Sequence, residues 1–413
     1  MAKEKETTPT MITGCDLLDL LLGGDKGVYG LPFGSILNII GDKSAGKSFL
    51  KNEIIAANHW ALGDRMAWES DDTESGDTFD TTRLYGFDIH PADRRIGSKR
   101  DIQDAATIEE MDAKVSLFLQ SIDKDQVGIY AVDSLDGLSD ATREAMEAGR
   151  LGQLKQNKEV KDPGDYGAQI AKFLSQQFFR TKHKKLEDAR VSLVLVSQIR
   201  DKMNATAYGP KWEVSCGKAL EFYSHTRVFL KTVRQIKKGN LVVGAYVEAS
   251  TIKSKTPRPY RKAYYSVYFD YGIDNIGSNL DYLFDLVNDK GEIIKDAAAA
   301  IAWDAGAKVK DLPSLTAWLE AQGLKDACRQ AKKEKTGNST LSLAWILEWV
   351  AADPDRALAL DREFGKEFSR EQLIEMCEKD PSMREELTRR VREKWEAAED
   401  AAASHRPSKY ARG

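Results

Sequence analysis

One eight-residue segment constrains this chain of 413 residues more than any other part of it: Gly41-Asp42-Lys43-Ser44-Ala45-Gly46-Lys47-Ser48. The segment has the full pattern GxxxxGK[ST]. It follows an apolar run at residues 35–40 and opens an amphipathic stretch at residues 47–62. The pattern needs that context, because its glycines let backbone N–H groups close around phosphate oxygens at the start of a helix. The segment therefore predicts a phosphate-binding loop between a buried strand and a helix.

The chemistry of this loop predicts ATP and Mg²⁺ as cofactors. Lys47 supplies a positive charge for the β- and γ-phosphates, and the Ser48 hydroxyl is a suitable Mg²⁺ ligand. Asp133 ends the apolar run at residues 127–132. A carboxylate at the carboxyl end of a buried strand is expected to hold the water ligands of Mg²⁺. Alternatively, Asp133 could cap the following helix.

Several acids follow another apolar run, at residues 65–68, and any of them could activate the attacking water. The candidates in this cluster are Glu69, Asp71, Asp72, Glu74 and Asp77. A general base must lie within reach of the water, and spacing alone does not select one member. A solvated acidic loop is an equally good interpretation for each of them.

The remaining pattern predicts an α/β core with a mostly parallel central sheet. Short apolar runs, including residues 191–196, alternate with amphipathic stretches such as residues 105–122. Three longer strands, at residues 226–233, 241–252 and 263–271, are expected to extend the sheet in antiparallel fashion. We expect a flexible arm at 1–10, the core at 11–297, a smaller helical domain at 298–403 and a disordered tail at 404–413.

Composition limits the classes of function. The net charge is −4, and the sequence contains neither an apolar run long enough to span a membrane nor an apolar signal segment. The four cysteines lie far apart, which favours reduced thiols in a cytoplasmic protein without a membrane partner. A chain with negative net charge must bind nucleic acid, if at all, through local basic loops.

The order of the motifs from about residue 11 to 274 resembles the RecA/UvsX family of recombinases. The residues that carry the resemblance are 13–18, 30–32, Asp72-Thr73-Glu74, 84–88, Val132-Asp133-Ser134, Ser197-Gln198-Ile199-Arg200, 217–223 and Lys253-Ser254-Lys255. The resemblance implies that Glu74 is the water-activating base and that Gln198 contacts the γ-phosphate. It also implies that Lys253 and Lys255 enter the ATP site of a neighbouring subunit. Without it, the two lysines would be interpreted as exposed strand residues.

The same resemblance implies two DNA-binding loops, near residues 149–167 and 200–217. The candidate DNA contacts of the second loop are Arg200, Lys202, Asn204, Lys211, Trp212 and Lys218. Basic and amide side chains can hold phosphates, and an aromatic ring can stack on bases. A solvated surface loop is the alternative for residues 149–167.

By resemblance, then, the chain is a DNA-dependent ATPase of recombination and repair. It would polymerise as a filament on single-stranded DNA and pair it with homologous duplex DNA. Only about ten residues precede the core, and Glu221 stands where bacterial members have lysine, so filament geometry stays open. Two alternatives remain: a ring helicase with the same core, or a nucleotide-gated DNA-binding regulatory module without strand exchange.

Overall fold

The structure is a computed structural model that describes residues 9–23, 27–73, 80–91, 95–96, 99–100, 104–139, 167–201, 212–214, 217–256, 258–303, 312–364 and 366–403. Glu74, Lys202, Asn204 and Lys211 lie outside these ranges, as do residues 1–8, 140–166 and 404–413. Among the described residues, no helix is long and apolar enough to cross a membrane.

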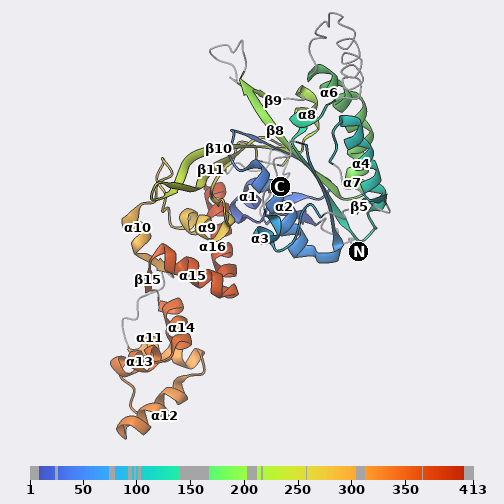
Figure 1. The fold of residues 1–413 in the computed structure, drawn as a ribbon. Helices are drawn as coiled ribbons and strands as arrows, with labels where there is room; N and C mark the ends of the chain where they lie inside the picture. The colour runs from blue at the N-terminus through green and yellow to red at the C-terminus, as the bar shows by residue number, and fades with distance from the viewer. Residues whose placement is uncertain are drawn as a thin grey trace, which may run out of the picture. The chain divides into compact units, whose positions relative to one another are not determined.

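A nine-stranded sheet forms the centre of the larger unit (Figure 1). Its order is β13-β12-β11-β10-β3-β8-β7-β4, with β9 paired to β8. The strands are β3 (Ile36–Gly41), β4 (Met66–Asp72), β7 (Val127–Asp133), β8 (Val191–Asp201), β9 (Trp212–Val214), β10 (Thr226–Lys238), β11 (Leu241–Ser254), β12 (Lys262–Tyr268) and β13 (Gly272–Asp274). Strands β10, β3, β8, β7 and β4 run parallel to one another, which confirms the predicted mostly parallel α/β core.

The prediction for the later strands was wrong in one respect. We expected all three to be antiparallel, but β10 runs parallel to β3, with Thr226 opposite Leu37 and Leu230 opposite Gly41. Only β11, β12 and β13 extend this parallel set in antiparallel fashion. Strands β10 and β11 are joined by a hairpin turn, and Gly239 there has a φ of 62°, which glycine adopts without steric cost.

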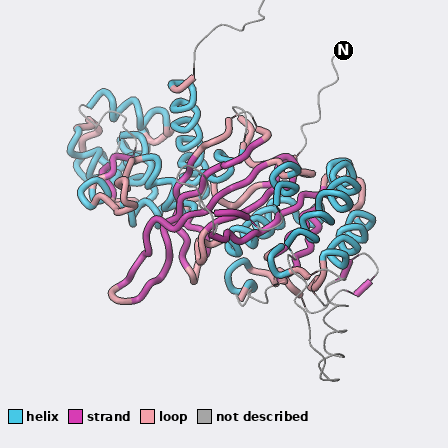
Figure 2. Tube along the Cα trace, turned by 90° about the horizontal axis from the view of Figure 1, so that it is seen from above, coloured by secondary structure: helices cyan, strands magenta, loops and turns pink. Residues whose placement is uncertain are grey.

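The central strands are buried on both faces because helices cover the sheet (Figure 2). All residues of β3 and β7 are buried. Helix α2 (Lys47–Leu62) follows the phosphate loop. Helix α4 (Ile108–Ser121) begins with a capping box, in which the Thr107 side chain accepts from the Glu110 N–H and the Glu110 carboxylate accepts in return. Its apolar positions repeat at helical spacing, and Phe118 packs edge-on against Tyr130 of β7.

Shorter elements complete the larger unit. They are β1 (Thr10–Met11), α1 (Asp16–Leu22), β2 (Leu31–Pro32), η1 (Gly63–Arg65), α3 (Thr81–Tyr85), β5 (Arg95–Ile96), β6 (Lys99–Arg100), η2 (Leu135–Gly137), α6 (Gly167–Phe173), the π-helical η3 (Leu174–Phe178), α7 (Phe179–Asp188), α8 (Gly217–Tyr223) and α9 (Asn275–Leu283). Thr10, which we expected in the flexible arm, pairs with Pro32 instead.

The second compact unit contains described residues of the ranges 284–288 and 292–385, while residues 386–403 belong to the first unit. Its elements are α10 (Lys295–Ala299), β14 (Ile301–Trp303), α11 (Leu312–Ala321), α12 (Lys325–Thr336), α13 (Leu343–Ala351), α14 (Pro354–Phe364), β15 (Lys366–Phe368), α15 (Arg370–Lys379) and the start of α16 (Pro381–Ala401). Sequence patterning predicted helices throughout and missed the antiparallel pair β14–β15. Gly323, whose φ is 69°, lies in the break between α11 and α12.

Helices α11 to α14 have a hydrophobic core of their own, which includes Leu315, Trp318, Cys328 and Ile346. These helices lie in the chain between β14 and β15, and the two strands pair directly with each other, Ile301 opposite Phe368. The helical segment is therefore an insertion within a small pair of antiparallel strands.

Candidate nucleotide-binding site

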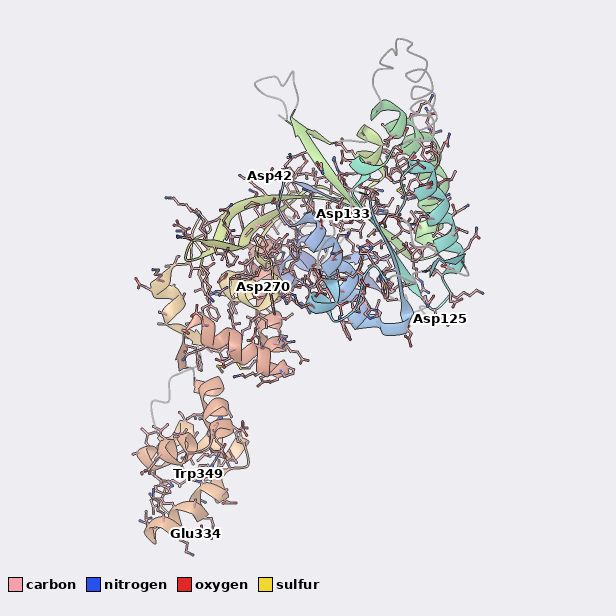
Figure 3. The ribbon with its side chains drawn as sticks, viewed as in Figure 1. Asp42, Asp125, Asp133, Asp270, Glu334 and Trp349 are labelled. Carbon is pink, nitrogen blue, oxygen red and sulfur yellow. The ribbon has the colours of Figure 1, made fainter. Side chains whose placement is uncertain are left out.

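The predicted phosphate loop, Asp133 and Gln198 converge where the parallel strands end. Figure 3 labels Asp42 and Asp133 at one end of the central sheet and Asp125, which precedes β7, at the other. Gly41 of β3 lies opposite Gln198 of β8. Asp72 of β4 lies opposite Asp133 of β7. The carboxyl edge of an open parallel sheet is where α/β folds bind ligands.

The phosphate loop is held against the neighbouring strand by its backbone. The Asp42 N–H donates to the Leu230 carbonyl at 3.1 Å. Gly41 packs so closely there that an added Cβ would meet the Leu230 carbonyl oxygen at 2.1 Å. Ser44 and Gly46 have positive φ values of 59° and 82°, after which α2 begins at Lys47. The loop thus turns sharply enough to direct the first N–H groups of α2 toward a bound anion.

Lys47 lies across the mouth of this loop. Its Nζ donates to the Asp42 carbonyl at 2.8 Å and to the Gly41 carbonyl at 3.2 Å. These contacts keep the ammonium at the loop, where the sequence predicts phosphate.

A cavity of about 540 Å³ adjoins the loop, which is within the usual size range for small-molecule sites. Its polar side is formed by Lys43, Ser44, Ala45, Gly46, Lys47, Ser48, Asp133, Ser134 and Gln198. Its apolar side is formed by Phe49, Val196, Ala245, Val247, Val267 and Phe269. The structure therefore brings the predicted loop, Asp133 and Gln198 to one cavity, with Gly41 and Asp42 at the base of the loop.

Sequence reasoning missed the apolar wall of the cavity. Ala245 and Val247 alternate along β11 and therefore share one face of the sheet, while Val267 lies near the end of β12 and Phe269 directly follows that strand. That alternation was visible in the sequence. Its proximity to the phosphate loop depends on the strand order, which alternation does not reveal.

Asp133 lies between the cavity and the protein interior. It is 8% exposed, and its Oδ2 lies 3.5 Å from the Nζ of Lys51, a fully buried lysine of α2. The Asp133 carbonyl accepts from the Thr73 N–H at 2.9 Å, and the peptide bond to Ser134 is cis. The alternative role as a helix cap is not seen, because Ser134 is the N-cap of η2. Lys51 is a further residue that sequence reasoning did not single out.

The structure separates the members of the acidic cluster. Asp71 is fully buried, forms an ion pair with Lys114 and accepts from the Tyr130 hydroxyl at 2.5 Å. Glu69 is also buried and lies 3.9 Å from Lys114. Both acids are thus engaged with Lys114 of α4, whereas Asp72 is the register partner of Asp133. Glu74 lies outside the described residues, so its role as the base stays a prediction.

Strand β8 continues from the cavity toward the predicted DNA loop. The Gln198 N–H donates to Asp136 Oδ2 at 2.8 Å, which ties the strand to the turn after β7. Beyond Gln198, Arg200 pairs with Glu213 and Asp201 with Trp212, so the ends of the predicted loop form a strand pair. Lys218 lies in α8. The backbone positions of Arg200, Trp212 and Lys218 are described, whereas residues 202–211 are outside the described ranges.

Lys253 and Lys255 lie away from their own phosphate loop. Lys253 is opposite Arg227 at the start of β10, whereas Leu230, further along β10, is opposite Gly41. Three residues of strand span about 10 Å. The Lys253 ammonium donates to the carbonyls of Glu221 and Phe222, the latter at 2.7 Å. Burial, followed by the charge of Lys255, lowers the pKa of Lys253, and burial also lowers the pKa of Lys255.

Together, the parallel sheet, the glycine-rich loop at the start of α2 and the cavity at the carboxyl edge define a P-loop nucleotide-binding protein. Residues 152–274 match the family model of the RecA N-terminal domain. The protein RecA of Sulfurovum sp. (strain NBC37-1) is 26% identical over 325 residues, which cover 78% of this chain and 84% of that protein. The protein RecA of a Nitratiruptor species is 27% identical over 281 residues, or 68% and 72% of the two chains.

A crystal structure of the RadB recombinase aligns over 64% of this chain and 98% of its own, with 15% identity and a TM-score of 0.39. The match to the family model and the two RecA proteins make this chain similar to the RecA family, at low identity.

Proposed function

We propose that this protein is a DNA-dependent ATPase of homologous recombination. It would assemble on single-stranded DNA, pair that strand with homologous duplex DNA and hydrolyse ATP. One observation carries the proposal: Gln198, which lines the nucleotide cavity, and Arg200, at the entrance of the predicted DNA loop, lie two residues apart on the same strand.

The cavity residues fit a magnesium–nucleotide complex. The Ser48 hydroxyl and the Asp133 carboxylate are hard oxygen ligands on one cavity, and Lys47 supplies a positive charge beside them. Ser48 and Asp133 would hold Mg²⁺, which would supply positive charge to neutralise the phosphates. Lys47 and the loop N–H groups would hold the phosphates, and the apolar wall would accept the base. Glu74, by resemblance, would take the proton of the attacking water.

The path along β8 suggests how ATP could control DNA binding. Gln198 would contact the γ-phosphate through its side chain, while its N–H is held by Asp136. A change at Gln198 would be transmitted along the strand to the ends of the loop, because Arg200 and Asp201 continue the same strand. DNA would then bind preferentially to the ATP state, since a ligand favours the conformation for which it has the higher affinity.

The position of Lys253 and Lys255 supports a site that two subunits complete. Neither lysine lines the cavity of its own chain. Their ammonium groups would act in a neighbouring subunit, where they would neutralise charge on the transferred phosphoryl group. Turnover would then depend on assembly, and self-association on DNA would stimulate it.

The first test is ATP hydrolysis with and without single-stranded DNA at matched salt, because phosphate contacts are sensitive to salt. We expect strong stimulation by single strands and none in Lys47→Ala, which should not bind nucleotide. Glu74→Gln should bind ATP and DNA but not turn over; rapid turnover by this variant would refute Glu74 as the base. Unwinding of a forked duplex would favour the ring helicase, and absence of DNA-stimulated turnover would favour the regulatory module.

A further inference from the structure

Lys51 is an unusual residue beside a phosphate loop, because its charge is entirely inside the protein. It follows Lys47 by four residues and therefore lies on the same face of α2, one turn further along, about 6 Å away. Its side chain is 0% exposed. Lysine is almost never fully buried unless it is paired, since removing an ammonium from water is costly.

The partner of Lys51 at the site is Asp133. Its Oδ2 lies 3.5 Å from Nζ, and the Asp133 side chain is 11% exposed. Asp133 also lines the nucleotide cavity, whereas Lys51 does not. The Asp133 carboxylate therefore lies between the Lys51 ammonium, on the interior side, and the cavity, where a magnesium ion would bind.

We propose that Lys51 is a positioning residue that acts as an internal counter-ion of Asp133; the proposal rests on the nucleotide and magnesium site described above. Before nucleotide binds, Lys51 holds the carboxylate in place and supplies positive potential to the phosphate cavity. Once a divalent cation is present, the same charge opposes it. The protein would thus bind nucleotide without magnesium more readily than a site lacking this lysine, and it would need more Mg²⁺ to saturate.

The opposing effect should be large enough to measure. Two unit charges several ångströms apart interact by kilocalories at an effective dielectric constant of about 20, so removal of Lys51 should shift ion binding by on the order of tenfold or more. Loss of the Lys51 charge should weaken nucleotide binding without magnesium and lower the Mg²⁺ concentration needed for saturation. Loss of packing alone would instead weaken nucleotide binding both with and without magnesium.

The experiment is a titration of the full-length protein with a fluorescent ADP analogue, in EDTA and across a series of Mg²⁺ concentrations, without DNA. Lys51→Met removes the charge and keeps much of the side-chain volume. We expect its affinity for the analogue in EDTA to fall about tenfold and its half-saturating Mg²⁺ concentration to fall by a similar factor. Lys51→Arg keeps the charge, so its half-saturating Mg²⁺ concentration should stay near the wild-type value.

Lys114→Met is the matched control. Lys114 is also largely buried and pairs with an acid, Asp71, but it does not line the cavity. Its removal should lower stability and leave both titrations unchanged.

The results separate this inference from the proposed function. If Lys51→Met matches wild type within twofold in both titrations, Lys51 only fills space and the inference is overturned. If the wild-type protein binds no nucleotide, both the proposed function and this inference are overturned. Should Lys51→Met not fold, the double variant with Asp133→Asn replaces it, since no buried charge is then left unpaired. Folding of the double variant would support the pairing, and its failure to fold would overturn the pairing.

Discussion

Gly41→Ala tests whether the contact between the phosphate loop and β10 determines nucleotide binding. The added Cβ would lie 2.1 Å from the Leu230 carbonyl oxygen and 2.9 Å from the carbonyl carbon and nitrogen of the same residue. All three are backbone atoms, so no side chain can rotate away. The end of β3 must therefore move relative to β10, and the bond from the Asp42 N–H to Leu230 should weaken or break.

The cost can be worked from these contacts. Overpacking of this kind costs about 1–3 kcal/mol, and loss of one backbone hydrogen bond adds about 1 kcal/mol. We therefore expect a loss of about 2–4 kcal/mol in the free energy of unfolding, measured by urea denaturation. Because the displaced loop no longer directs its N–H groups at phosphate, nucleotide affinity should fall at least tenfold, which corresponds to about 1.4 kcal/mol.

Gly63→Ala is the matched control, at the other end of α2. Gly63 has a φ of 55°, and no atom lies within 4 Å of its added Cβ. Its substitution should cost about 1–3 kcal/mol of stability through backbone strain alone and leave nucleotide affinity unchanged. The reasoning is refuted if Gly41→Ala binds nucleotide as tightly as Gly63→Ala does.

Two further predictions concern buried acids near the site. Asp71→Asn should lower the free energy of unfolding by about 3 kcal/mol, because it leaves the largely buried Lys114 without its closest counter-ion. Nucleotide affinity should be unchanged; a fall in affinity would make Asp71 a site residue. Burial raises the pKa of Glu53 from 4.5 to about 7, so the folded state holds this proton more tightly and wild-type stability falls as pH rises between those values. Glu53→Gln, which still accepts from the Ile273 N–H, should gain up to about 3 kcal/mol over wild type between pH 4.5 and 8 in urea denaturation; parallel pH profiles would contradict this.

Local features of the site were predictable from the sequence. The phosphate loop, its strand and its helix are consecutive, so eight residues and their flanks sufficed to place Lys47 and Ser48. Asp133 was predictable because strand ends follow from apolar runs. Gln198 was selected by resemblance to the RecA family, and the structure places it on the same cavity.

Features that depend on contacts between distant parts of the chain were not predictable. Nothing in the sequence around Lys51 distinguishes it from an exposed helix residue. It is buried because α2 packs against the sheet. The direction of β10 is set by the connection that brings it beside β3, and no alternation of residues distinguishes a parallel strand from an antiparallel one. The spacing of the acidic cluster likewise did not show that Asp71 pairs with Lys114 of α4.

The insertion of α11–α14 between β14 and β15 has a consequence for how this chain could diverge. Trp303 and Lys366 are register partners, so the insertion leaves and rejoins the strand pair at positions only about 5 Å apart. Because this segment has its own core and its two ends lie close together, the strands before and after it can pair whatever the length of the segment. Lineages could therefore lengthen, exchange or delete this segment while the nucleotide site stays under separate selection.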